Sequence, residues 1–123
     1  MFGTGRIPAF SQTMSHKHFV DAVVRRVIAN PSPDPNSPRH IYSIRVVEPS
    51  VFHLRADIEE RLPVSDTPIN VGSLYASDLY RFEPETVKNV LHGIISSGAR
   101  TVEVKVADEA GGPWEIIRVH LPD

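Results

Sequence analysis

The side chains best suited to acid–base or metal chemistry gather in one short segment, from His53 to Glu60. His53 is followed by Asp57, Glu59 and Glu60, which form the densest acidic cluster in the chain. If the segment is a β-strand, His53, Asp57 and Glu59 lie on one face, because alternate residues of a strand point to the same side. Carboxylates beside an imidazole could bind a hard cation or transfer protons. The same charges on an edge strand discourage unwanted strand pairing, which is the interpretation we favour.

The other histidines offer weaker chemistry. His16 and His18 have the spacing of a chelating pair only on a strand, whereas on a helix their side chains diverge by about 200°. Lys88 and His92 are four residues apart on the polar face of a predicted helix, where we expect solvation. A small enzyme that combines the acidic cluster with its own histidine or with His92 is therefore an alternative rather than the leading interpretation.

Sequence motifs of known catalytic or cofactor chemistry are absent. The 123 residues include no cysteine, no G-x-S-x-G and no S-x-x-K. Gly3 and Gly5 are not flanked by a predicted strand and helix, so they do not form a phosphate-binding loop. Gly111 and Gly112 fall between two predicted strands and indicate a turn. We therefore predict no catalytic, cofactor-binding or metal-binding residue and favour a protein that is not an enzyme.

An aromatic stretch between positions 74 and 82 is the strongest candidate for a protein contact. Tyrosine is enriched at protein interfaces because its ring can be buried while its hydroxyl keeps a hydrogen bond. The same side chains could instead complete a small hydrophobic core, and the sequence leaves both interpretations open. The predicted interface residues are Leu74, Tyr75, Leu79, Tyr80 and Phe82.

Positive charge is concentrated in the first half of the chain. Residues 1–56 hold seven Lys or Arg and three Asp or Glu, a net charge of +4, and residues 57–123 hold six and twelve, a net charge of -6, which together give -2. This asymmetry could support head-to-tail self-association or nucleic-acid binding. A pI near 6.3 and the lack of an RNA-binding motif make nucleic acid the less favoured partner. Its candidate contacts are Arg25, Arg26, Arg39, Arg45 and Arg55.

Two segments have the spacing of amphipathic helices. Residues 16–29 repeat apolar side chains at helical intervals, with Ser15 in position to cap the first turn. Residues 84–98 begin with Pro84 at the first helical position, end at Gly98 and carry a stripe of valine, leucine and isoleucine. Each stripe must be buried against another element.

Three segments predict β-strands: 40–48, 101–107 and 114–121. In the last two, apolar residues alternate with charged ones, which is typical of a strand with one buried and one wet face. These two strands, joined as a hairpin, follow the helix at 84–98 and form a helix–hairpin unit with it. Segment 51–62 fits either a strand or a helix, and we favour a strand paired with 40–48. Segment 74–82 could adopt either structure.

The two ends of the first predicted helix are flanked by irregular segments. Residues 1–14 show no sustained periodicity and predict a flexible tail before a single domain over 15–123. Residues 31–38 contain four prolines and predict a semi-rigid linker. No run approaches the roughly 18 apolar residues of a membrane span, and the N-terminus lacks the apolar core of a secretory signal. We therefore expect a soluble, cytoplasmic protein without membrane contact.

Together these elements predict an α+β fold with two layers. An antiparallel sheet of three or four strands would carry two helices on one face. The expected function is that of a small non-catalytic protein-binding or regulatory module that self-associates through the aromatic stretch or an exposed sheet edge. A nucleic-acid-binding accessory protein and a small enzyme are the alternatives, and no cofactor is expected.

Overall fold

The computed structural model describes residues 10–29, 40–63, 69–107 and 115–122. The predicted linker at 31–38, Arg39 and the glycine pair at 111–112 lie outside these ranges. Along the chain the elements are β1 (Phe10–Thr13), α1 (His16–Ala29), β2 (His40–Glu48), α2 (Ala56–Glu59), β3 (Ser73–Tyr75), α3 (Ala76–Leu79), α4 (Pro84–Ser96), β4 (Thr101–Ala107) and β5 (Glu115–His120).

The strands form one mixed sheet of five strands in the order β1-β5-β4-β2-β3. Neighbouring strands are antiparallel except β1 and β5, which run parallel. The α+β class is confirmed, but the predicted antiparallel sheet of three or four strands is wrong in size and in strand direction at one edge. The two edge strands have only four and three residues, too few for a periodic pattern in the sequence. β1 also falls within the segment 1–14 that we predicted as a tail.

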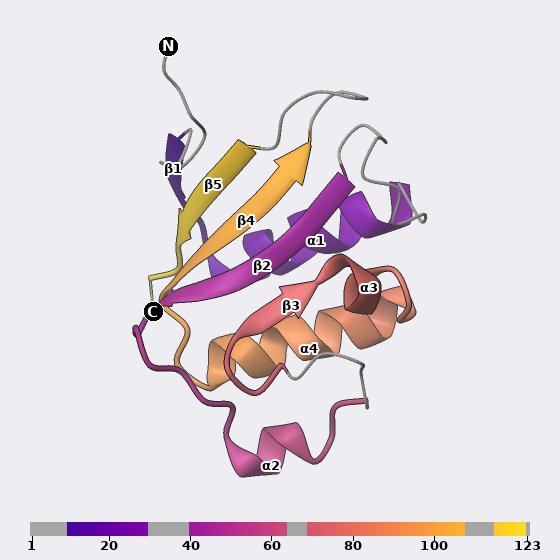
Figure 1. Ribbon diagram of the computed structural model, residues 1–123, viewed down its shortest axis with the longest axis vertical. Helices are drawn as coiled ribbons and strands as arrows, with labels where there is room; N and C mark the ends of the chain where they lie inside the picture. The colour runs from indigo at the N-terminus through magenta and orange to yellow at the C-terminus, as the bar shows by residue number, and fades with distance from the viewer. Residues whose placement is uncertain (1–9, 30–39, 64–68, 108–114, 123) are drawn as a thin grey trace.

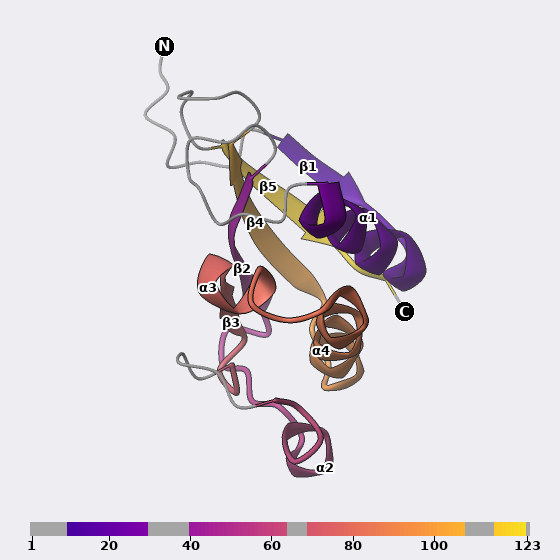
Figure 2. The ribbon, with the colours of Figure 1, turned by 90° about the vertical axis from the view of Figure 1, so that its right-hand side faces the viewer.

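Both long helices lie on the same side of the sheet. α1 and α4 lie behind the strands in Figure 1, and the rotated view in Figure 2 shows them together on one face. They also contact each other, so their apolar stripes and the inward side chains of the sheet close a single core. Fully buried core side chains include Val20, Ile41, Ile44, Leu74, Leu79, Val87, Val90, Leu91, Val102, Val106 and Leu121.

Three residues predicted at the helix ends have the expected roles, although α4 ends at Ser96, before the predicted 98. The Oγ of Ser15 accepts a hydrogen bond from the backbone N–H of His18 at 3.1 Å, so Ser15 caps the first turn of α1. Pro84 begins α4, and Gly98 follows its end with a φ of 110°, a conformation that glycine adopts without strain.

Alternation along β4 separates the core from the opposite face of the sheet. Val102, Val104 and Val106 are buried, while the residues between them point away from the helices. In the ladders, Glu103 pairs with Arg45 of β2 on one side and with Arg118 of β5 on the other. The strand order thus places three charged residues in one row across the sheet.

The segment 51–62 is not the strand that we favoured. The backbone N–H of Leu54 donates to the carbonyl oxygen of Asn70 at 2.9 Å, and Ala56–Glu59 form the short helix α2. β3 occupies the position beside β2 that we assigned to this segment. The helix-forming residues and the burial of Ile58 outweigh the alternation of apolar and polar residues.

Candidate binding surface on the sheet

The sheet face opposite α1 and α4 is left uncovered by both long helices and faces the viewer in Figure 1. Its central side chains come from β2, β4 and β5. A shallow depression of about 130 Å³ is lined by Ser43, Arg45, Glu103, Lys105 and Ile116. We refer to these five residues together with Arg118, Tyr42 and Tyr75 as the open face.

Glu103 lies at the centre of the open face between two arginines. Its Oε1 accepts a hydrogen bond from Arg45 Nη2 at 2.8 Å, and its Oε2 accepts one from Arg118 Nη2 at 2.6 Å. Burial alone would raise the pKa of Glu103, but the hydrogen bonds and charges of Arg118 and Arg45 outweigh burial and lower this pKa below its usual value. The carboxylate is therefore ionised at neutral pH and orients both guanidinium groups, while the Arg45 side chain stays 59% exposed.

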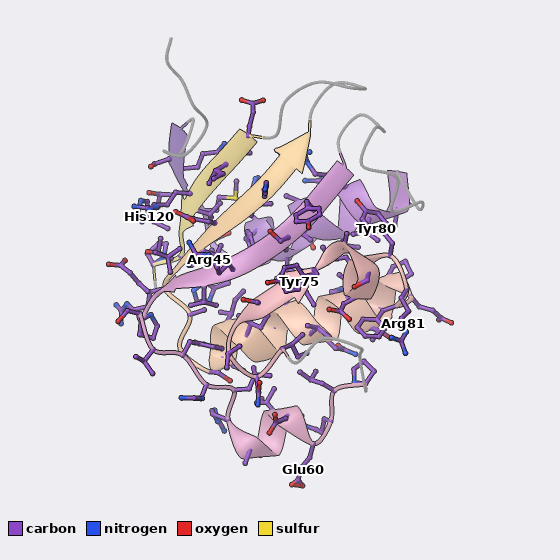
Figure 3. All side chains as sticks on the ribbon, viewed as in Figure 1. Arg45, Glu60, Tyr75, Tyr80, Arg81 and His120 are labelled. Atoms are coloured by element: carbon purple, nitrogen blue, oxygen red, sulfur yellow. The ribbon has the colours of Figure 1, made fainter. Side chains whose placement is uncertain are left out.

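Two tyrosines flank this charged centre. The Nζ of Lys105 lies 5.1 Å from the centroid of the Tyr42 ring, a cation–π contact. Tyr75 pairs with Ser43 in the ladder between β3 and β2, and Figure 3 shows it on the same side of the sheet as Arg45. Tyr42 and Tyr75 are 42% and 39% exposed, so both offer aromatic surface to a partner.

Positive charge exceeds negative charge on the open face. Three cations and one carboxylate give it a net charge of +2: Arg45, Lys105, Arg118 and Glu103. At the end of β2, Glu48 accepts a hydrogen bond from the Thr101 hydroxyl at 2.6 Å, and that hydroxyl lies 3.2 Å from His120 Nδ1. Counting Glu48 still leaves an excess of one positive charge, whereas the whole chain carries -2. The open face is a positive region on a negative protein.

Most residues of the aromatic stretch are placed in the core. Leu74 and Leu79 are each 1% exposed, and Phe82 packs half-buried against the core. Tyr80 is also half-buried. Tyr75 is the member of the predicted interface whose side chain stays exposed on the open face, so a contact through this stretch would depend mainly on Tyr75.

Tyr80 has a structural role at the edge of β2. Its hydroxyl oxygen accepts a hydrogen bond from the backbone N–H of Ile41 at 3.0 Å. β3 pairs only with residues Ser43 to Arg45 of β2. The hydroxyl therefore supplies a hydrogen-bond acceptor to a part of β2 that β3 does not reach. Burial raises the pKa of Tyr80, against the opposing effects of this hydrogen bond and of Arg26, and the hydroxyl therefore stays protonated at neutral pH.

The arginines predicted for nucleic acid are spread over several elements. Arg25 and Arg26 lie on α1, Arg55 directly precedes α2, and Arg45 alone lies on the open face. Arg39 lies outside the described residues. The fold does not gather the described members of this set into one patch.

Sequence reasoning missed Lys105 and Arg118 as members of a surface. Both occupy polar positions in strands whose alternation we predicted, so their outward direction had a signal in the sequence. Their proximity to Arg45 had no signal in the sequence, because it depends on β4 and β5 lying in order beside β2. The pairing of distant strands creates the cluster.

The acid–base cluster around Asp57, which we considered as an alternative, is not assembled. The helical turn of α2 replaces the strand that would have aligned Asp57 with His53, and the Asp57 carboxylate pairs with Arg55 at 2.9 Å. The hydrogen bond from Arg55 lowers the pKa of Asp57 below its usual value. His92 lines a separate cleft, and none of the described residues that line it is an Asp or Glu. Within the described ranges, no group of three His, Asp or Glu is placed to hold a metal ion.

No protein-family model, no curated protein and no solved structure matches this chain. Among the helices of the described segments, none combines the length and the apolar character needed to cross a membrane. The argument for function therefore rests on the surfaces of this molecule.

Proposed function

We propose that this protein is a non-catalytic binding module whose open face recognises an acidic segment of a partner protein. The observation that carries the proposal is the row of Arg45, Glu103 and Arg118, with Lys105 beside it, on a sheet face that both long helices leave uncovered. Guanidinium groups bind carboxylates through forked pairs of hydrogen bonds. The flanking tyrosine rings supply apolar contact area with little loss of side-chain freedom.

The hydrogen bonds of Glu103 favour binding by ordering the arginines in advance. A long side chain that becomes fixed on association lowers the affinity by the entropy it loses. Arg45 and Arg118 are already held on the sheet by Glu103, so an acidic ligand meets donors in a preset arrangement. Glu103 is half-buried between the two arginines, with its side chain 14% exposed, which keeps this arrangement in place.

A second copy of the chain is a less suitable partner for the open face than an acidic segment of another protein. Two copies meeting face to face would bring together surfaces of +2 each, and like charges across an interface oppose binding. For a head-to-tail contact, the densest acidic run is Asp57, Glu59 and Glu60. Arg55 and Arg61 flank this run, so the segment from Arg55 to Arg61 has a net charge of only -1. A partner with a denser acidic run complements the open face better than a second copy does.

Single-stranded nucleic acid is the second candidate, and the exposure of Tyr42 and Tyr75 favours it. Bases stack on aromatic rings, and cations beside the rings bind the phosphates. We rank it second because the open face has only three cations, and the Glu103 carboxylate at their centre opposes a polyphosphate chain.

Titration followed by NMR tests this proposal. Isotope-labelled protein at low salt is titrated in separate experiments with octaglutamate, with the oligonucleotide decauridylate and with a neutral glycine–serine peptide. We expect octaglutamate to shift the amide signals of Arg45, Glu103, Lys105 and Arg118, and the shifts to weaken with added salt. The neutral peptide should shift none of them.

Two lysine variants provide the matched control. Lys105→Glu reverses a charge on the open face and should abolish the octaglutamate shifts, whereas Lys88→Glu makes the same change on α4 and should leave them unchanged. Shifts with decauridylate alone would favour the second candidate. If neither probe perturbs the open face and the sedimenting mass rises with concentration, self-association replaces the proposal.

A further inference from the structure

A cleft of about 590 Å³ lies between α2 and α4, beside the start of α1. Its volume is within the range of small-molecule sites. It shares no lining residue with the depression on the open face. The polar residues that line it are His16, Arg61, Asn89, His92 and Ser96.

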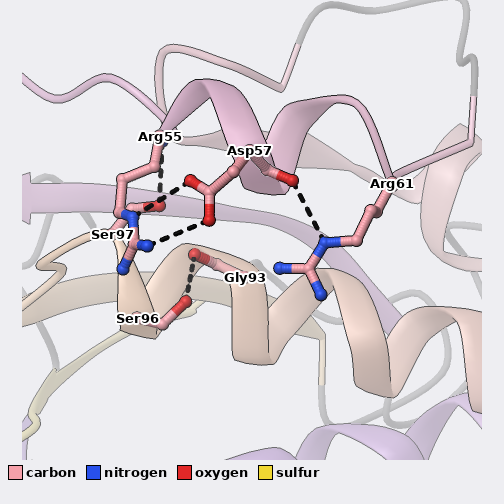
Figure 4. Close-up of polar contacts among 6 residues, drawn as sticks. All are labelled: Arg55, Asp57, Arg61, Gly93, Ser96 and Ser97. Atoms are coloured by element: carbon pink, nitrogen blue, oxygen red, sulfur yellow. Dashed lines mark hydrogen bonds and ion pairs between the residues drawn. The ribbon is translucent and has the colours of Figure 1, made fainter.

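Gly93 allows α2 to lie close enough to α4 to form this cleft. A Cβ atom at position 93 would come within 2.6 Å of Ile58 Cγ2, so any larger residue would push α2 away. The backbone N–H of Arg55 donates to Ser97 Oγ at 3.1 Å and ties the start of α2 to the end of α4 (Figure 4). The walls of the cleft are therefore held in place by packing and by a hydrogen bond.

Arg61 makes the cleft attractive to anions. Its Nε donates to the carbonyl oxygen of Asp57 at 3.1 Å, and Figure 4 shows its guanidinium group extended toward α4. The two terminal nitrogens make no hydrogen bond to any residue of the described segments. The carboxylate of Asp57 forms its hydrogen bonds with Arg55 and attracts Arg61 only through its charge. The described lining of the cleft itself contains no acidic side chain.

His16 adds a polar atom without a partner. Its Nε2 is buried and makes no hydrogen bond within the described structure. An unpaired buried polar atom costs free energy, and a bound molecule would recover that cost when a small rotation of the ring turns Nε2 into the cleft. His92 and Asn89 line the same cleft from α4, so polar side chains from α1, from the turn after α2 and from α4 surround one space.

The cleft also has three apolar lining residues, Ile58 and Leu62 from α2 and the turn after it and Ile95 from α4. We propose that the cleft binds a small organic anion, a carboxylate or a phosphate ester with an apolar body. Arg61 binds the anionic head among the histidines and Asn89, and the body packs against the aliphatic side chains of the lining. This site does not depend on the open face or on its partner.

Binding of four simple probes to the full chain, mapped by NMR, tests the site. The probes are phenyl phosphate, benzoate, inorganic phosphate and benzyl alcohol. We expect phenyl phosphate or benzoate to shift the amide signals of Arg61, His92 and Gly93. Inorganic phosphate lacks the apolar body and benzyl alcohol lacks the charge, so each should bind at least about tenfold more weakly. The tighter of the two aromatic anions identifies the head group as phosphate ester or carboxylate.

Matched variants separate this site from general attraction of anions. Arg61→Gln should weaken the tighter probe by about tenfold, and Arg25→Gln, the same change on the exposed part of α1, should leave the affinity unchanged. His92→Gln should weaken binding, whereas His53→Gln should not. The proposal is overturned if no probe shifts these signals, if Arg61→Gln binds like the unmodified chain, or if the shifts fall on the open face.

Discussion

The open face and the α2–α4 cleft both present arginines, yet the fold positions them by different means. On the open face, Arg45 and Arg118 stand on strands that pair with β4 along most of their length. In the cleft, Arg61 follows a helix of four residues that is held by its contact with Gly93 and by the hydrogen bond to Ser97.

This difference predicts different responses to mutation. A ladder fixes the direction of each side chain through many backbone hydrogen bonds, so changing one surface side chain leaves its neighbours in place. A single helical turn has few internal hydrogen bonds and depends on its packing. We therefore expect the cleft to be lost through one packing change and the open face to be altered only by changing its own side chains.

Gly93→Ala should have the largest effect. Alanine favours a helix over glycine by about 1 kcal/mol, but its Cβ would collide with Ile58, and overpacking costs about 1–3 kcal/mol. We expect a net loss of up to about 2 kcal/mol in urea unfolding, together with loss of probe binding in the cleft. Octaglutamate binding on the open face should persist.

Gly98→Ala is the matched control for this variant. Gly98 has a φ of 110°, but no atom lies within 4 Å of a Cβ built there. The cost is therefore backbone strain of about 1 kcal/mol, without displacement of α2. Equal effects of the two variants on cleft binding would contradict the role that we assign to Gly93.

Tyr80→Phe should have the next largest effect, and it tests the sheet side of the comparison. The substitution keeps the ring but leaves the backbone N–H of Ile41 without its acceptor at the edge of β2. An unsatisfied buried donor costs about 1–3 kcal/mol, and we expect about 1.5 kcal/mol by urea unfolding. Tyr75→Phe should change stability by less than about 0.5 kcal/mol, because Tyr75 is exposed. Similar losses of unfolding free energy in both variants would contradict the structural role of the Tyr80 hydroxyl.

Glu103→Gln should destabilise the protein by about 1 kcal/mol at pH 7, since the exposed Arg45 and the half-buried Arg118 lose a charged acceptor. The folded-state pKa of Glu103 lies below its unfolded value of about 4.3, so its contribution is complete above that pH and is lost as the pH falls through the folded pKa. The stability difference between the two proteins should therefore shrink below about pH 4.3. A difference that stays constant to low pH would contradict the ionised role of Glu103.

The long elements of the fold could be predicted because their patterns are local. The helices at 16–29 and 84–96 and the strands β2, β4 and β5 each contain enough residues for a period of 3.6 or 2 to appear. β1, α2 and β3 have four residues or fewer and exist because they pair or pack with distant segments. The parallel pairing of β1 with β5 is of this kind, which is why the sheet was predicted too small.

The candidate surfaces were less predictable than the fold for the same reason. Alternation indicated that Glu103, Lys105 and Arg118 face away from the core, but Arg45 and Glu103 are 58 positions apart in the chain. His92 was expected on a solvated helix face, and it is exposed. The cleft beside it arises only when α2 settles on Gly93, a contact that no periodic pattern in either segment encodes.

Lys105→Glu and Arg61→Gln should have the smallest effects on stability and give the sharpest test of the comparison. Both side chains lie at the surface, and surface substitutions of this kind usually change stability by less than about 0.5 kcal/mol. We expect Lys105→Glu to abolish octaglutamate binding and leave phenyl phosphate or benzoate binding intact. Arg61→Gln should weaken the tighter aromatic anion by about tenfold and leave octaglutamate binding intact. Independent sites give this crossed pattern because distant, unconnected groups contribute additively. If either variant weakened both ligands equally, a single positive region would attract all anions, and the distinction between the open face and the cleft would fail.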